Sequence, residues 1–279
     1  MPGTVSGLRL YFTDRWTAQF ASARFPESDT RENDQRTKSP TTLGMQPTSH
    51  KSGTSPKNPR PVASPFSTEA SLVDSIASAI GHDSGIEIVR EFDSLHGIAD
   101  LVLFRASKAW ESRLSLASVP SQWAFLLRSL PYRRAMSFDY FWGATHASKA
   151  TAKRLARCFC SAGYLEQNSK TRTFTKIRQP QPLISEIVAI EAKLTKWRDA
   201  LQQARRYQHF AHKSWVVLDA TRARPAIQNL ELFERSGIGL ATCDENGSMI
   251  HHISAKRILP KTDLLYWRAN VELSRKLVS

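Results

Sequence analysis

Apolar positions along residues 67–112 predict a helix followed by a β-hairpin. Leu72, Val73, Ile76 and Ile80 recur at helical spacing. Ser67 or Thr68 can cap the start of this helix, and Gly81 ends it. The runs IEIVREF and IADLVLF follow, and the turn sequence DSLHG separates them. Two strand-like runs around a short turn indicate a β-hairpin.

Residues 180–250 alternate between strand-like and helix-like patterns. The run ISEIVAIEAKL predicts a buried strand, TKWRDALQQARRYQHFAHK a long helix, SWVVLDA a second strand, AIQNLELFERSG a short helix and IGLATCD a third strand. Together with the first helix and hairpin, this order predicts an α/β fold with a mixed sheet flanked by helices.

Residues 113–179 have a different pattern and interrupt this α/β order. QWAFLLRSL, SFDYFWGAT and SKATAKRLARCFCSAG predict helices, and YLEQNSKTRTFTKIRQ alternates around a polar centre as a two-stranded wing would. Helix, helix, helix and hairpin in this order resemble a winged helix-turn-helix, and the phrase CSAGYLEQ is typical of that fold. We therefore expect an inserted winged-helix domain, which the sequence QPQP at 179–182 closes.

The insert carries cations where a winged helix usually meets DNA. Its third helix would enter the major groove, and its wing would lie beside it. Such cations bind phosphates more than bases, and the alternative is a solvated helix face or a protein-contact surface. The expected DNA-binding residues are Lys149, Lys153, Arg154, Arg157, Lys170 and Arg172, with Lys176 as a further wing cation.

Residues 1–63 are rich in Ser, Thr, Pro and charge, and apart from a weak helical pattern at 8–22 they show no helical or strand period. Such a segment buries too little apolar surface to fold, so we expect a disordered basic tail. It is either an extension without a role or an arm that contacts nucleic acid. The expected domains are therefore a tail at 1–63, a core in two parts at 64–112 and 180–279, and the insert at 113–179.

Charge and composition point to a polyanionic partner. The 279 residues carry 39 Lys and Arg against 25 Asp and Glu, a formal charge of +14. This excess favours nucleic acid, although charge alone does not separate it from anionic lipid. No run approaches the ~18 apolar residues of a membrane helix. Three cysteines cannot make a disulfide framework, so we expect a reducing, cytoplasmic location.

Charged residues inside the apolar strands indicate a reactive site. Asp100 interrupts IADLVLF, and Glu191 and Lys193 interrupt AIEAKL. A charge within an apolar strand is costly unless it is paired or bound to a metal. Because side chains alternate along a strand, Glu191 and Lys193 face the same way. If the two strands are neighbours, Asp100 and Glu191 can share Mg²⁺ or Mn²⁺, which prefer oxygen ligands.

This D…ExK pattern resembles the PD-(D/E)xK nuclease superfamily, the restriction-endonuclease-like fold. The resemblance covers 67–112 and 183–250 and implies an αβββαβ core, Mg²⁺ (or Mn²⁺) and phosphodiester hydrolysis. It makes Asp100 and Glu191 metal ligands, Lys193 the catalytic lysine and Glu69 the helical acid, a third metal ligand. Ala99 stands where the motif has proline.

The helix after the lysine extends the resemblance. Many members of the superfamily carry a QxxxY pattern there, and Gln203 and Tyr207 match it on one helix face. Gln203 would complete the catalytic pocket, and Tyr207 would contact backbone or the phosphate of bound DNA. Trp197, Leu201, Ala204 and Ala211 would pack on the sheet.

Structural alternatives exist for each of these residues. Asp100 could pair with Arg90 or Arg105, and Glu191 and Lys193 could lie on a solvated strand face. The acid of Glu69 could serve the helix dipole, and Gln203 and Tyr207 could be surface and packing groups. The pairs that we expect to be structural, without a metal, are His209 with His212, His251 with His252, and Cys158 with Cys160.

The sequence therefore favours a Mg²⁺-dependent nuclease that binds double-stranded DNA through the insert and is not a membrane protein. No P-loop or nucleophile-elbow motif occurs. A non-catalytic winged-helix DNA-binding regulator on the same scaffold is the second reading. A protein-interaction module in a larger assembly is the third, and a homodimer stays open.

Overall fold

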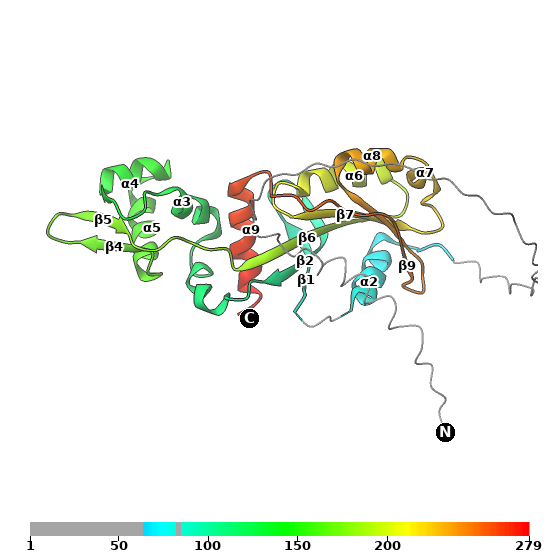
Figure 1. Cartoon of the computed structure of the whole chain (residues 1–279), viewed down its shortest axis with the longest axis horizontal. Coiled ribbons are helices and arrows are strands. Elements are labelled where there is room, and N and C mark those ends of the chain that lie inside the picture. The colour runs from blue at the N-terminus through cyan, green and yellow to red at the C-terminus, as the bar shows by residue number, and fades with distance from the viewer. Residues whose placement is uncertain (1–63, 82–84, 279) are drawn as a thin grey trace, which may run out of the picture. The chain divides into compact units, whose positions relative to one another are not determined.

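The computed structural model describes residues 64–81 and 85–278. The tail expected at 1–63 lies outside these residues. Within them, the fold is mixed α/β, and its largest sheet has the strand order β1-β2-β6-β7-β8-β9 (Figure 1). The bounds of these strands are β1 Glu87–Asp93, β2 Ile98–Ala106, β6 Ile184–Lys193, β7 Lys213–Asp219, β8 Gly239–Cys243 and β9 Met249–Ile253.

The sheet contains both antiparallel and parallel strand pairs. A short turn joins β1 to β2, so they pair antiparallel, and β2 also pairs antiparallel with β6. Helical crossovers join β6 to β7 and β7 to β8, and these pairs are parallel. The last pair, β8 and β9, is antiparallel. The predicted hairpin and mixed sheet are thus present, with β9 as an additional edge strand.

Helices cover both faces of this sheet (Figure 1). α2, Glu69–Ile80, buries Leu72, Ile76 and Ile80, begins at the capping residue Thr68 and ends at Gly81, whose φ is 67°. α6 and α8 lie on the other face, where Trp197 and Phe233 belong to one apolar cluster. The bounds on that side are α6 Trp197–Tyr207, α7 Arg224–Ile227 and α8 Leu230–Ser236.

Two predicted helices differ from the structure. The long helix expected over 195–213 ends at Tyr207, because the His212 N–H donates to the Ile187 carbonyl and starts the next strand. The helix expected over 226–237 is two short helices, α7 and α8. The break falls at Asn229, whose side-chain amide donates to the Pro225 carbonyl, a local bond that competes with helix continuation.

The insert forms a second sheet with the order β3-β5-β4 and several helices. Phe141, Phe159 and Phe174 pack within its core. The apolar face predicted for the third helix is confirmed, since Ala152, Leu155, Ala156 and Phe159 are buried. The bounds are η1 Glu111–Leu116, η2 Ser121–Trp123, α3 Ala124–Ser129, β3 Ala135–Ser137, α4 Phe138–Thr145, α5 Lys149–Ser161, β4 Leu165–Asn168 and β5 Thr173–Lys176.

The last helix, α9 Asp263–Arg275, joins the insert to the sheet. Buried Asn270 accepts from the Leu183 N–H at 2.7 Å and donates to the Ile184 carbonyl at 3.2 Å, at the start of β6. Arg275 donates to the carbonyls of Ala117 and Val119 in the insert at 3.3 and 3.2 Å. No helix among the described residues is long and apolar enough to span a membrane.

Candidate active site

Neighbouring strands bring Asp100 and Glu191 together. The register of β2 and β6 ends at the pair Leu101 and Ile190, so Asp100 and Glu191 are each one residue beyond it. Both therefore point away from the face of Leu101 and Ile190. Beyond the pair Leu101 and Ile190, a side chain contacts the neighbouring strand: Asp100 Oδ2 accepts from the Ala192 N–H at 2.7 Å. Glu191 is only 1% exposed, which excludes the solvated strand face.

Lys193 bridges two acids. Its Nζ lies 3.0 Å from Glu191 Oε1 and 3.0 Å from Glu69 Oε2. The side chain is 16% exposed, so the ammonium lies at the boundary between the interior and solvent. The structure thus brings Glu69, Asp100, Glu191 and Lys193 to one end of β6.

The start of α2 is fixed where Glu69 can reach the lysine. Thr68 accepts from the Ser71 N–H at 3.0 Å, which caps the helix. Just before it, the Phe66 N–H donates to Asp219 Oδ2 at 3.1 Å. Asp219 is fully buried at the end of β7 and also accepts from Thr221. Asp219 therefore positions Glu69 through the backbone that precedes α2.

Helix α6 supplies the remaining contacts of Glu191. The Tyr207 hydroxyl oxygen lies 2.5 Å from Glu191 Oε2 and 2.7 Å from the Ile98 carbonyl. The Gln203 amide, oriented with its nitrogen towards Glu191, donates to both carboxylate oxygens, at 3.1 Å to Oε2. The expected pocket role of Gln203 fits this geometry. Of the two contacts that we predicted for Tyr207, the one with backbone is present, to the Ile98 carbonyl, whereas its burial does not fit a contact with the phosphate of DNA.

Burial and mutual repulsion disturb the acids of the site. Burial raises the pKa of Asp100 against the lowering effect of its backbone hydrogen bond and Lys193, and the charges of Glu69 and Glu91 raise it further. Burial and then the charge of Asp100 raise the pKa of Glu191. Burial opposes the charge of Lys193, but hydrogen bonds to Glu191 and Glu69 outweigh it and raise the pKa of the lysine. Lys193 is therefore a fixed cation between acids that repel each other.

The predicted three-carboxylate metal site is not assembled. Within residues 64–81 and 85–278, no group of three or more His, Cys, Asp or Glu side chains is placed to hold a metal ion. Glu69 faces Lys193 instead, because the ammonium lies between it and Glu191. The carboxylates that share a face next to each other are Asp100 and Glu191, a pair of hard oxygen donors suited to Mg²⁺ or Mn²⁺.

Two further acids near this site, Glu91 and Asp219, were not among the predicted site residues. Glu91 stands between the paired residues Arg90↔Leu101 and Phe92↔Ala99, so it lies across from Asp100. Its φ of 49° is left-handed, which breaks the alternation that would have revealed its direction. Asp219 ends the apolar run SWVVLD, and that buried acid at a strand end was a usable signal.

The structure also shows the contacts of Arg90 and of the histidines for which we considered a purely structural role. Arg90 pairs with Asp74 at 2.5 Å, not with Asp100. His212 is buried and its Nδ1 accepts from the Ile187 N–H at 3.0 Å, as expected of a structural histidine. His209 contacts Thr262 at 2.7 Å, and His252 contacts Thr242 at 3.1 Å.

Six of the cations predicted to bind DNA are exposed on the insert. The prediction that Lys176 is a wing cation is wrong. Lys149, Lys153, Arg154 and Arg157 are exposed on α5, and Lys170 and Arg172 are exposed in the β4–β5 loop. Lys176 alternates inward with Phe174 and is fully buried. Its Nζ donates to the carbonyls of Leu127 and Arg128 at 3.2 Å each, at the end of α3.

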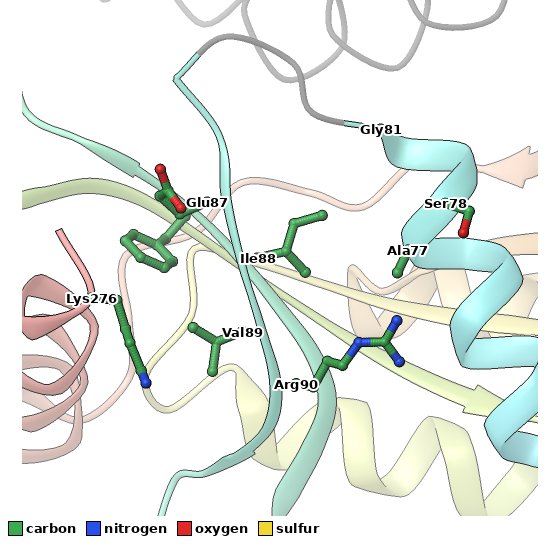
Figure 2. Close-up of a pocket in the computed structure, with 9 residues that line it drawn as sticks. Ala77, Ser78, Gly81, Glu87, Ile88, Val89, Arg90 and Lys276 are labelled. Atoms are coloured by element: carbon green, nitrogen blue, oxygen red, sulfur yellow. The ribbon is translucent and has the colours of Figure 1, made fainter. Parts of the chain in front are cut away.

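A cavity of about 770 Å³ lies elsewhere, between α2 and the edge strand β1. Figure 2 shows Ile88 and Arg90 projecting from β1 towards α2, with Val89 on the opposite side of the strand near Lys276. The residues predicted for catalysis do not line this cavity. The candidate site at the end of β6 is therefore separate from this cavity.

No family model matches this chain, and neither a curated protein nor a solved structure does so. The interpretation of the site therefore rests on the residues of this chain and on how its own strands bring them together.

Proposed function

We propose that the chain is a metal-dependent nuclease that hydrolyses phosphodiester bonds in DNA. The observation that carries the proposal is the ammonium of Lys193 at 3.0 Å from Glu191, beside Asp100 on the neighbouring strand. A buried Glu191 and a half-buried Asp100 with raised pKa values, next to a fixed cation, form an arrangement that structural packing alone does not need. Perturbed ionisable clusters of this kind are typical of active sites.

Asp100 and Glu191 are the residues that would hold Mg²⁺ or Mn²⁺. Their oxygens are hard donors, and a divalent cation would relieve the repulsion that raises both pKa values. The bound ion would supply an activated water and charge neutralisation at the phosphate.

The surrounding side chains have distinct parts in this proposal. Lys193 stays protonated, so it stabilises negative charge that develops on the phosphoryl oxygens rather than removing a proton. Glu69 holds the lysine in place through its 3.0 Å contact. Tyr207 and Gln203 orient Glu191 from α6.

The proposal extends to the two parts of the fold. The sheet would be a restriction-endonuclease-like core, with α2 before a hairpin and parallel strands β6 and β7 joined by α6. The insert would be a winged helix, since its order is α3, β3, α4, α5 and then the β4–β5 hairpin. In that arrangement α5 would present its exposed cations to the major groove of double-stranded DNA.

A plasmid cleavage assay tests the activity. Purified protein meets supercoiled and linear DNA with Mg²⁺, Mn²⁺ or EDTA, beside Asp100→Ala and Lys193→Ala. The matched controls are Asp199→Ala on α6 and Lys108→Ala after β2, both exposed. We expect metal-dependent nicking that falls by about 10²-fold or more in both site variants and stays unchanged in both controls.

Two outcomes would overturn the proposal. Cleavage that survives in both site variants would place the activity elsewhere. Salt-sensitive DNA binding without cleavage in the unsubstituted protein would leave the DNA-binding regulator as the function.

A further inference from the structure

The turn between β1 and β2 exposes two apolar side chains beside the candidate active site. Leu95 is 57% exposed and Ile98 is 59% exposed. Ile98 begins β2 two residues before Asp100, so by strand alternation its side chain shares the face of Asp100. Its carbonyl accepts from the Tyr207 hydroxyl at 2.7 Å, the same hydroxyl that contacts Glu191. The turn and the site are therefore parts of one local structure.

Leu95 occupies a backbone position that disfavours it. Its φ is 69°, in the left-handed region where Gly, Asn or Asp is the usual residue. Its side chain gains little from burial in return. A branched apolar residue that is both strained and exposed contributes nothing evident to folding, and such positions often have a functional reason.

The turn is rigid despite its exposure. The Leu95 N–H donates to Asp93 Oδ1 at 2.8 Å, and the Ser94 N–H and hydroxyl donate to the Gly97 carbonyl at 3.0 and 2.7 Å. From α9, Arg268 donates to the Asp93 carbonyl at 3.0 Å. The backbone thus holds Leu95 and Ile98 in fixed positions, as a preorganised contact requires.

Charged groups of both signs and a pair of imidazole rings lie near the turn, where Asp93 is exposed and its carboxylate accepts from the Leu95 N–H. Arg268 reaches the turn from α9, and the His96 ring lies 5.4 Å from the His209 ring. The charge of Lys261 acts on His209, which places that ammonium nearby. Exposed apolar side chains next to the proposed phosphodiester site complement the apolar faces of nucleic-acid bases, and Arg268 is a cation within reach of the anionic backbone.

We propose that the turn Leu95–Ile98 is an apolar wedge that contacts unstacked bases next to the scissile phosphate. This inference rests on the proposed nuclease function and names its substrate class, DNA with an unpaired or mispaired step. Such a step costs least to open, so a wedge selects it over a fully paired duplex.

Base unstacking is measured without cleavage. A duplex with 2-aminopurine at a mispaired step, and its fully paired counterpart, meet the protein in EDTA. The variants are Leu95→Asn, which suits the left-handed backbone, and Ile98→Thr, which keeps the branched β-carbon. The control is Leu259→Asn, because Leu259 is 82% exposed outside the turn.

We expect the unsubstituted protein and the control to raise 2-aminopurine fluorescence on the mispaired duplex and to bind it about tenfold more tightly than the paired one. The double variant Leu95→Asn, Ile98→Thr loses both effects and keeps its circular dichroism spectrum. Equal fluorescence in that variant and the unsubstituted protein would overturn the wedge. Loss of self-association in the variant by sedimentation velocity, with fluorescence unchanged, would assign the turn to a second copy of the chain instead.

The two proposals fail separately. Metal-dependent cleavage with equal rates on paired and mispaired DNA, and no change in fluorescence, would leave the nuclease and remove the wedge. Unstacking in EDTA without cleavage in Mg²⁺ would leave the wedge as a DNA contact and remove the nuclease.

Discussion

The Tyr207 hydroxyl has one proton to donate, and two acceptors lie within hydrogen-bond distance of its oxygen. Those acceptors are Glu191 Oε2 and the Ile98 carbonyl. The hydroxyl is the donor in both contacts, so its single proton is shared between the carboxylate and the carbonyl. Donation to the carboxylate favours its charged form and lowers the pKa of Glu191 against the raising effect of burial.

Removing the Tyr207 hydroxyl changes two separate quantities, the pKa of Glu191 and the unfolding free energy. Because the Tyr207 hydrogen bond lowers the pKa of Glu191, Tyr207→Phe raises that pKa further. It also leaves the Ile98 carbonyl without this donor, so we expect a loss of about 1–2 kcal/mol of unfolding free energy. Carboxyl carbon NMR across a pH titration and urea denaturation measure the two quantities. Tyr164→Phe in the insert is the control and leaves the Glu191 titration unchanged; an unshifted Glu191 in Tyr207→Phe would contradict the expectation.

At the scale of elements, Lys176 joins β5 to the end of α3. Burial, then the charge of Arg128, lowers its pKa from 10.5 to about 8. Between pH 8 and 10.5 the unfolded chain holds a proton on this lysine that the folded protein lacks. The stability from this group therefore rises with pH across that window.

Lys176→Met removes this pH dependence. We expect the unfolding free energy of the unsubstituted protein to gain about 1–2 kcal/mol from this lysine between pH 8 and 10, and the variant to lack that gain. Urea denaturation at both pH values measures it, with exposed Lys153→Met as the matched control. Parallel pH curves for Lys176→Met and the control would show that Lys176 does not titrate in this way.

Helix α9 stabilises the point where the chain re-enters the sheet. The Asn270 side chain bonds the backbone of Leu183 and Ile184, and it is fully buried. Asn270→Ala leaves these backbone groups buried without partners, so we expect a loss of about 2–4 kcal/mol in the urea unfolding free energy. Asn229→Ala, which removes one bond to the Pro225 carbonyl, should cost less than about 1 kcal/mol. Similar losses in both would show that the buried position adds nothing.

At the scale of the whole molecule, the excess of Lys and Arg predicts that the affinity for DNA falls as the salt concentration rises. If α5 contacts phosphates, Arg154→Ala and Arg157→Ala each reduce the slope of log affinity against log salt by about 1 for double-stranded DNA. Fluorescence anisotropy over a salt series measures the slope. Arg235→Ala on α8 removes the same charge from an exposed site and should leave the slope unchanged. Equal slopes in all variants would move the DNA contact away from α5.

Much of the fold follows from local patterns. The α2 helix, the β1–β2 hairpin and the apolar face of α5 form where periodicity, Thr68 and Gly81 predicted them, because each element depends on residues close in sequence. The sequence did not mark β9 or α9 in the same way. α9 buries residues around much of its circumference, including Asn270 and Ser274, so it lacks a clear apolar stripe.

For the candidate site too, some features follow from the sequence and others only from the tertiary structure. Asp100, Glu191 and Lys193 could be chosen from the sequence because a charge in an apolar strand needs a partner whatever the fold. The tertiary structure decided which partner each one has: Ala192 for Asp100, Lys193 for Glu69, and a buried Tyr207 for Glu191. It also placed Lys176 inside and Glu91 across from Asp100. Residue type fixes what a side chain can do chemically, but long-range packing sets the distance, burial and charge around it.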